Sequence, residues 1–459
     1  MTWQSWQAGM IRSALIVGAT AAAFATVLMA TRRLGAESNL AVLAAVLTLT
    51  RARRPAGDAG ARFSWVEMWR LPLIAILAAA TAVLLHRYFA LGAVLFIASL
   101  SLAAWLPVFG MRGRAFGTAM ALPFIGVLIV PASPHARGGV LIDVLLIVMA
   151  AWVAHLYARL VEVVAARLLA QNPGSRSSAA QPKAGKISVF ARMALQMASA
   201  LLAAFVIGYF LFGAHWSWCV LTAYIVCAGT VSRGEAVYKG LLRLLGALAG
   251  TLAAALLQRF LVPEGAESAA VIFVSLFIGV WLREFNYAFW ALCMTLIMAT
   301  LQGVAGGSGP EELNVRLLAI VAGALCAIAA AWLLMPIRTR AYAGRVLADT
   351  LAAFDHSLRS NHPGGEEAVA HCLARLERVA PALRLHCWVI RAKPDSDHPA
   401  FWVAPARSCS KCLARFTGDK AALIRAIGLA RRTLAGRDGA VYAALASLEQ
   451  LARGGEPRA

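Results

Sequence analysis

Charged residues are scarce in this chain of 459 residues, since Asp, Glu, Lys and Arg make up 14% and hydrophobic residues make up 61%. Soluble domains carry about 25% charged residues, and a soluble fold could not hide so much apolar surface. Acidic residues are the rarest, 22 against 43 basic ones, and 11 of the 22 follow Pro336. The scarcity excludes a soluble globular protein and predicts an apolar membrane part followed by an aqueous C-terminal part.

Motifs of common catalytic and ATP-driven proteins are absent from the sequence. It contains no His-x-x-x-x-Asp, Gly-x-Ser-x-Gly or His-Glu-x-x-His. Before Gly185-Lys186, Ala180 stands where a phosphate-binding loop needs its first glycine, and Ile187 stands where the loop needs Ser or Thr. These absences argue against a membrane enzyme and against an ATP-driven motor.

The first apolar stretch has no charged segment before it and is about 20 residues long, which is enough to span a bilayer. It therefore predicts a first membrane helix rather than a cleaved leader, with Trp3 and Trp6 as interfacial anchors. Four of the cysteines also fall in apolar runs, so no extracellular disulfide framework is indicated.

Twelve apolar runs predict an all-α, polytopic membrane protein with about twelve transmembrane helices. The runs lie near 9–30, 36–50, 71–89, 91–109, 115–132, 139–158, 189–213, 216–231, 241–262, 268–283, 286–303 and 314–336. A polar stretch separates the first six runs from the last six. The predicted domains are a first membrane half, a cytoplasmic linker, a second membrane half and a C-terminal cytoplasmic helical domain, at 1–170, 171–188, 189–336 and 337–459.

The two halves show signs of an internal repeat. When 95–109 is aligned with 271–285, Ser99, Trp105 and Phe109 match Ser275, Trp281 and Phe285. Two halves of six spans each enter the membrane from the same side, so the repeat is predicted to be parallel, about an axis along the membrane normal. A substrate path would then lie between the halves.

Basic residues orient the chain in the membrane. With the N-terminus in the cytoplasm, 18 Lys and Arg residues fall in inside segments and six fall outside, which satisfies the positive-inside rule. We therefore predict a multi-pass protein of the cell inner membrane with both termini in the cytoplasm. The same placement explains the net charge of +21 without nucleic acid as a partner.

The C-terminal part shows the mixed charges and apolar periodicity of helices, as in 366–380. Cys409 and Cys412 have CxxC spacing, but zinc needs four convergent ligands and the other Cys and His candidates are irregularly spaced. No metal and no cofactor are predicted.

Residues 215–257 are the most distinctive segment of the sequence. They begin with tryptophans and continue with a Thr-Ala pair, a Ser-Arg-Gly turn and an Arg-Leu-x-Gly-x-x-x-Gly helix; these are Trp216, Trp218, Thr222, Ala223, Ser232, Arg233, Gly234, Arg243, Leu244, Gly246 and Gly250. This pattern resembles the fusaric acid resistance and aromatic acid exporter superfamily. The resemblance implies six helices, a cytoplasmic connection, six more helices and export of small organic anions.

Two interpretations of this segment stand side by side. In the structural one, Gly246 and Gly250 let a neighbouring helix pack closely, and the basic residues only set the topology. In the functional one, an aromatic carboxylate needs a π surface and a positive end. The candidate substrate-binding residues are then Trp216, Trp218, Thr222, Tyr224, Arg233, Arg243, Tyr287 and Trp290.

Asp143 and His155 are candidates for proton coupling, because ionisable groups are costly inside a bilayer. They lie twelve residues apart on the sixth run, roughly 18 Å along a helix, so they would serve separate steps. The alternatives are that Asp143 caps its helix and that His155 faces the headgroups.

The sequence therefore predicts an inner-membrane secondary transporter that exports small organic anions, aromatic carboxylates first among them. A passive organic-anion channel and a membrane-anchored sensor or scaffold acting through 337–459 are the alternatives. Besides the lipid bilayer and the substrate, a periplasmic adaptor protein and a homo-oligomer stay open as partners.

Overall fold

The computed structural model describes residues 3–33, 39–52, 65–129, 139–168, 187–260, 266–283, 285–304, 310–334, 336–360, 364–393, 397–413, 416, 418–436 and 440–454. Throughout this part of the chain the secondary structure is helical, with no strand. The chain forms two compact units. Among the described residues, unit 1 comprises those within 1–173, 182–229 and 239–334, and unit 2 comprises those within 230–238 and 335–459.

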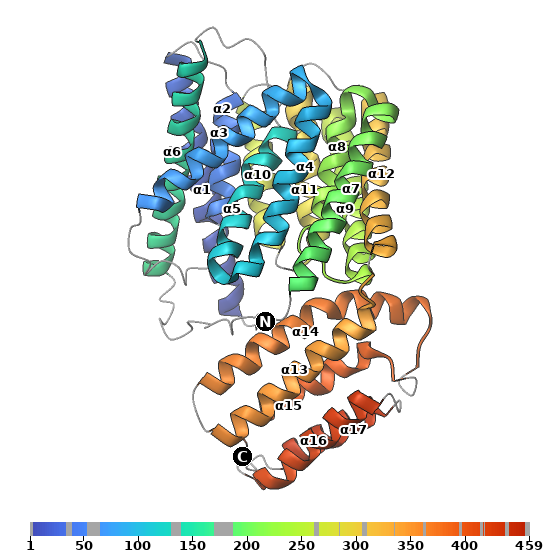
Figure 1. Ribbon diagram of the computed structural model, residues 1–459. Helices are drawn as coiled ribbons and strands as arrows, with labels where there is room; N and C mark the ends of the chain where they lie inside the picture. The colour runs from blue at the N-terminus through green and yellow to red at the C-terminus, as the bar shows by residue number, and fades with distance from the viewer. Residues whose placement is uncertain are drawn as a thin grey trace. The chain divides into compact units, whose positions relative to one another are not determined.

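Unit 1 is a bundle of long helices that run in broadly similar directions (Figure 1). Its helices are α1 (Trp3–Arg33), α2 (Asn39–Arg51), α3 (Trp65–Arg87), α4 (Phe89–Trp105), α5 (Gly110–Ile129), α6 (Gly139–Leu168), α7 (Ile187–Phe212), α8 (Trp216–Cys227), α9 (Arg233–Phe260), α10 (Ala266–Leu282), α11 (Tyr287–Val304) and α12 (Pro310–Leu333). Short 3-10 turns follow α4 and α7, at Leu106–Phe109 and Gly213–His215. Each apolar run of the sequence therefore forms one helix.

Seven of the described helices are long and apolar enough to cross a membrane. The qualifying segments are Trp6–Arg33, Trp69–Arg87, Phe89–Phe109, Val144–Leu168, Val189–Phe212, Arg233–Leu257 and Asn314–Leu333. Five further helices are apolar but shorter. Large apolar side chains are exposed on many of these helices, among them Phe210 and Leu333, which only a lipid environment accommodates. The protein is a multi-pass membrane protein.

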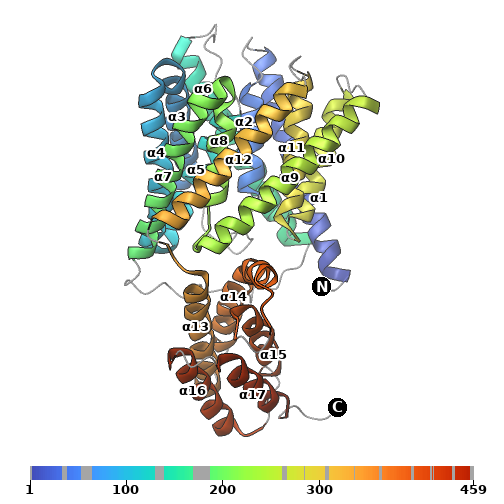
Figure 2. The same cartoon turned by 90° about the vertical axis from the view of Figure 1, so that its right-hand side faces the viewer.

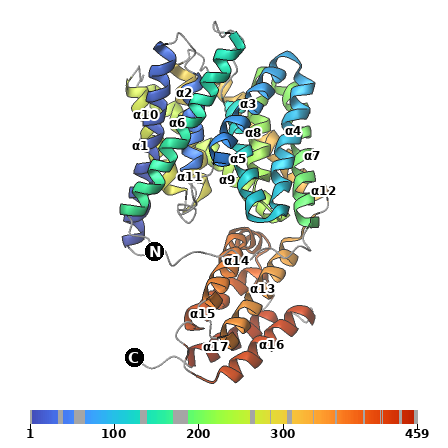
Figure 3. The ribbon, with the colours of Figure 1, turned by 60° about the vertical axis from the view of Figure 1, so that its left-hand side comes forward.

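Some of the helix contacts of unit 1 recur six helices later. Helices α1, α2 and α6 pack together, as do α7, α8 and α12, and the α4–α5 pair corresponds to α10–α11. Figures 2 and 3 show the bundle from two further sides. Across the halves, α4 contacts α7 and α10 contacts α1. Helix α10 comes six helices after α4, and α1 comes six helices before α7, so the two contacts correspond.

Several helices begin earlier than the apolar runs indicate. Helix α3 begins at Trp65 rather than near 71, so Arg70 lies inside it, and α9 begins at Arg233 rather than near 241. Arg243, which the charge count assigns to an inside segment, therefore lies ten residues into α9 and is 3% exposed. An amphipathic first turn lowers the local hydropathy, so hydropathy alone places such a boundary too late.

Helices α9 and α11 lie unusually close together at two glycines of α9. A Cβ atom added to Gly246 would lie 2.5 Å from the Cβ of Ala291, and one added to Gly250 would lie 2.5 Å from the carbonyl oxygen of Leu292. Small residues four apart leave one helix face bare, so two backbones can approach. The structural interpretation of these two glycines is confirmed.

Unit 2 contains α13 (Thr339–Ser360), α14 (Gly364–Val389), α15 (Val403–Leu413), α16 (Lys420–Gly436) and α17 (Val441–Gly454), with a 3-10 turn at Pro399–Trp402. Its buried core includes Leu347, Leu351, Phe354, Leu376 and Leu445. Their aliphatic and aromatic groups supply the hydrophobic free energy of this unit, about 25 cal/mol per Å² of apolar surface buried.

Cys409 and Cys412 belong to this core and are buried between α15 and its neighbours. Burial, followed by the charge of Glu449, raises the pKa of the Cys409 thiol to about 12. A thiol that stays protonated is a poor metal ligand and a poor nucleophile. No group of three His, Cys, Asp or Glu side chains suited to a metal ion is present among the described residues.

Candidate functional site

The turn before α9 is fixed by a reciprocal cap. The carboxylate of Glu235 accepts hydrogen bonds from the backbone nitrogens of Val231 (2.9 Å) and Ser232 (3.0 Å), and the hydroxyl of Ser232 accepts one from the backbone nitrogen of Glu235 (3.4 Å). This is a capping box, which satisfies backbone donors at a helix start. The Ser-Arg-Gly turn of the sequence therefore has a structural role, which is to begin α9 at Arg233.

Two helices of unit 1 bring a cation against an aromatic ring. The guanidinium carbon of Arg316, on α12, lies 3.9 Å from the ring centroid of Trp218, on α8. The same guanidinium donates a hydrogen bond to the carbonyl oxygen of Thr295 on α11 (3.3 Å), and Arg316 is 2% exposed. Because cation–π attraction is strongest over tryptophan and away from water, this geometry holds the charge in the interior of the bundle.

Further basic residues continue from this pair along α9. Arg243 lies within electrostatic range of both Arg316 and Tyr287. One turn nearer the start of α9, the ammonium of Lys239 lies 5.8 Å from the ring centroid of Tyr287 and donates to the carbonyl oxygen of Ala228 (2.5 Å). We call Arg316, Arg243 and Lys239, with Trp218 and Tyr287, the cation series.

The cation series passes from one end of the bundle toward the other. Trp218 and Arg316 lie near the beginnings of α8 and α12, whereas Lys239 and Tyr287 lie near the beginnings of α9 and α11. Successive helices connected by short turns run in opposite directions, so these two pairs of helix starts lie at opposite ends. Arg243 occupies the position between them.

Thr222 adds a polar group next to Trp218, four residues further along α8 and thus on the same helix face. Its hydroxyl is fully buried and makes no hydrogen bond within the described part of the chain. Other buried threonines of the bundle, such as Thr48, Thr251 and Thr295, donate to the carbonyl oxygen four residues before them. The hydroxyl of Thr222 differs from these in making no such hydrogen bond.

A family comparison covers these helices. Residues 199–330, from within α7 to near the end of α12, match the family described as fusaric acid resistance protein-like. This stretch of the chain is similar to the fusaric acid resistance protein-like family. No curated protein and no solved structure gives a significant match.

The matched stretch contains the whole of the distinctive segment and every member of the cation series. Together with the apolar helices, it indicates a membrane transporter of the efflux type. At the level of the family, this favours transport over catalysis.

The other predicted site residues make contacts of their own. Trp216 packs in an aromatic cluster, with ring centroids 5.3 Å from both Phe205 on α7 and Phe89 on α4. Tyr224 packs against the core of α8 and its neighbours. These two side chains contribute to the packing of the bundle, against the same core cluster as Trp218, and their assignment to the substrate site stays a prediction.

Two further predicted residues lie at other places. The ring of Trp290 is 5.6 Å from the guanidinium of Arg283, at the turn between α10 and α11. Arg233 belongs to unit 2, where its backbone nitrogen donates to the carbonyl oxygen of Ile337 (3.3 Å). Both residues act at helix ends in the described structure.

Asp143 and His155 lie on the same helix, α6. The side chain of Asp143 lies outside the part that the structure describes; its backbone is the fifth residue of α6, inside the helix and not at its cap. His155 is half-buried. The proton-coupling assignment of both residues stays a prediction.

Arg316 is the functional candidate that the sequence interpretation missed, because the charge count placed it with the outside loop residues. The available signal was its position inside the apolar run 314–336, where an arginine is costly. The ring that accepts it is almost one hundred residues away in the sequence, so only the fold shows the pair.

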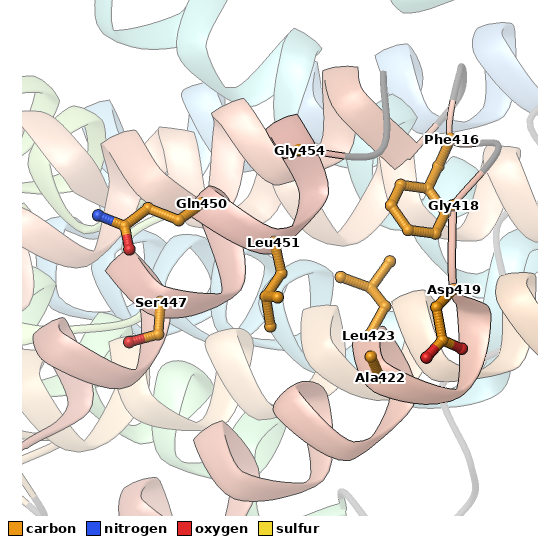
Figure 4. Close-up of a pocket in the computed structure, with 9 residues that line it drawn as sticks. All are labelled: Phe416, Gly418, Asp419, Ala422, Leu423, Ser447, Gln450, Leu451 and Gly454. Atoms are coloured by element: carbon orange, nitrogen blue, oxygen red, sulfur yellow. The ribbon is translucent and has the colours of Figure 1, made fainter. Parts of the chain in front are cut away.

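A surface pocket of unit 2 lies apart from the cation series (Figure 4). It is lined by residues from the beginning of α16 and from α17, including Leu423, Ser447 and Leu451. Asp419 is the titratable residue of its lining. The pocket offers an anionic substrate no positive charge, so it does not compete as the substrate site.

Proposed function

We propose that the protein exports small organic anions, in the first place aromatic carboxylates, across the cell inner membrane. The observation that carries this proposal is the buried guanidinium of Arg316 over the ring of Trp218. An aromatic carboxylate pairs its carboxylate with arginine and its ring with an aromatic surface. The hydroxyl of Thr222 would donate to the same carboxylate.

The remaining members of the cation series provide the route. An anion leaving Arg243 meets Lys239 one helical turn further toward the start of α9, or Arg316 in the other direction. Successive cations spread the cost of moving a negative charge through the bilayer interior over several sites. Tyr287 and Trp218 supply aromatic surface near the two ends of the route.

The architecture that we propose has twelve spans in two parallel six-helix repeats related by an axis along the membrane normal. It is supported by the recurring helix contacts, above all α4 with α7 and α10 with α1. The excess of basic residues supports cytoplasmic termini and an inner-membrane location. The cation series belongs to the second repeat, so we propose that this repeat holds the substrate.

A passive anion channel is the second candidate function. It is favoured by the same cation series, which would conduct an anion without any proton-carrying group. The exporter differs from the channel in requiring coupling, and we propose Asp143 and His155 on α6 as the proton-carrying groups.

The test is transport of a panel of aromatic and aliphatic carboxylates in proteoliposomes that contain the full chain, at two imposed pH gradients. The exporter predicts selective flux that follows the pH gradient and that Asp143→Asn makes independent of it. Flux that follows only the electrochemical gradient of the anion would establish the channel. No flux of any carboxylate, from correctly inserted protein, would contradict both.

A further inference from the structure

The C-terminal end of α14 in unit 2 exposes three consecutive large apolar side chains. Trp388 is 78% exposed, Val389 63% and Ile390 52%. Among the described residues of unit 2, only Leu429 and Leu451 are other exposed large apolar side chains, and these stand singly. Isolated exposed apolar residues are ordinary, but a contiguous group marks an interaction surface.

Basic residues surround this apolar group. Arg384 precedes it by one turn of α14, and Arg391 and Lys393 follow it; all three side chains are exposed. No acidic residue occurs between Arg384 and Lys393. We call residues 384–393 the α14 tip.

The backbone at the α14 tip is closed by two hydrogen bonds. The backbone nitrogen of Arg391 donates to the carbonyl oxygen of Trp388 (3.2 Å), and that of Ala392 donates to the carbonyl oxygen of Cys387 (3.0 Å). These bonds form a Schellman motif, in which the residue at the position of Arg391 adopts the left-handed conformation and is usually glycine. Arg391 has φ +49°.

An arginine at this position costs conformational free energy that a glycine would avoid. The fold of α14 alone would therefore favour glycine at this position. The motif places Arg391 directly after Trp388, Val389 and Ile390, with its side chain exposed.

We propose that the α14 tip binds the anionic surface of the bilayer that the same chain spans. Trp and aliphatic side chains enter the headgroup region while Lys and Arg bind anionic headgroups. Five residues connect the end of α12 to α13, and Ala343 near the start of α13 packs with Leu383 near the end of α14, so the chain keeps the tip within reach of that surface. The inference does not depend on the transported substrate.

The test uses the full chain with a benzophenone amino acid in place of Trp388, in nanodiscs of zwitterionic lipid alone or with anionic phosphatidylglycerol. After illumination, mass spectrometry identifies what the residue has bonded to. We expect phospholipid adducts that increase when anionic lipid is added and that decrease in high salt. The same amino acid at Leu451, exposed on α17, is the matched control and should give no such adducts.

The variant Arg391→Gly tests the contribution of the positive charge without disturbing the fold of α14. Glycine suits the left-handed position, so the variant keeps α14 intact, while the loss of one cation near an anionic surface should lower anionic-lipid adducts about fivefold. Adducts to unit 1 or to a second copy of the chain would each overturn the proposal. Lipid adducts whose yield changes neither with lipid charge nor with Arg391→Gly would also overturn it.

Discussion

Arg316 illustrates what a single residue contributes when it lies in the interior of a membrane bundle. Its guanidinium is held by the ring of Trp218 and by the carbonyl oxygen of Thr295, which are groups from two other helices. Burying a charged side chain at membrane depth costs several kcal/mol, so such residues mark functional sites. Arg243 shares this burial and lies within electrostatic range of Arg316.

Replacing Arg316 tests the substrate site. Arg316→Gln should lower carboxylate flux by about tenfold or more, because a charge-assisted hydrogen bond contributes about 1.5–3 kcal/mol. The measurement is the initial rate in proteoliposomes, normalised to inserted protein. Arg32→Gln, at an exposed arginine at the end of α1, is the control and should leave the rate unchanged.

Replacing Trp218 tests selectivity at the same place. Trp218→Leu should reduce flux of aromatic carboxylates more than that of aliphatic ones, whereas Trp218→Phe keeps a ring under Arg316. Flux is compared across the carboxylate panel at equal protein levels. A loss of protein abundance with an unchanged preference for aromatic over aliphatic carboxylates would show that the role of Trp218 is purely structural.

At the scale of elements, the contact between α9 and α11 determines where Arg243 and Tyr287 lie. Gly250→Ala places a Cβ 2.5 Å from the carbonyl oxygen of Leu292, so the helices must separate, at a cost of about 1–3 kcal/mol. We expect a lower midpoint of thermal unfolding in detergent and lower flux. Gly18→Ala is the control, since nothing lies within 4 Å of the added atom. Equal midpoints for both variants would contradict the close packing.

A pair of histidines, His386 and His398, joins α14 to the 3-10 turn at Pro399–Trp402 in unit 2. His386 Nδ1 lies 3.0 Å from His398 Nε2, and His398 Nδ1 accepts a hydrogen bond from the backbone nitrogen of Ala400 (3.2 Å). Burial, His386 and Arg340 lower the pKa of His398 below 6.5. The fold therefore favours the neutral ring.

The sign of the pH effect follows from that lowered pKa. The unfolded state takes up the proton first as the pH falls, so the stabilisation is complete above about pH 6.5 and is lost as the pH falls through the lowered pKa. Hydrogen-exchange protection of residues 397–402, corrected for intrinsic rates, should decrease in this range. In His398→Asn, the protection of these residues should change little with pH. If the protection still decreases as in the unchanged protein, another group causes the effect.

At the scale of the whole molecule, the proposed topology makes a direct prediction. With twelve spans and both termini in the cytoplasm, a reporter that works in the cytoplasm should be active at either terminus. A reporter that works only in the periplasm should be inactive at both. A periplasmic reporter inserted between α11 and α12, at residues 305–309, should be active. A periplasmic signal from the C-terminus would show an odd number of spans and would contradict the parallel repeat.

The apolar runs by themselves determined the membrane class and the approximate position of every helix from α1 to α12, because a helix in lipid must present apolar side chains along its length. The Gly-x-x-x-Gly spacing likewise predicted a close helix contact, which the structure shows between α9 and α11. These properties are local, so the sequence contains them directly.

The tertiary structure decided which candidates meet. Trp216 and Trp218 are two residues apart, yet one packs among Phe89 and Phe205 while the other lies under Arg316, because residues two apart face different sides of a helix. The partner of Trp218 comes from α12, and no local pattern specifies it. Contacts between distant segments depend on how whole helices pack, and for that physical reason the site emerged only from the fold.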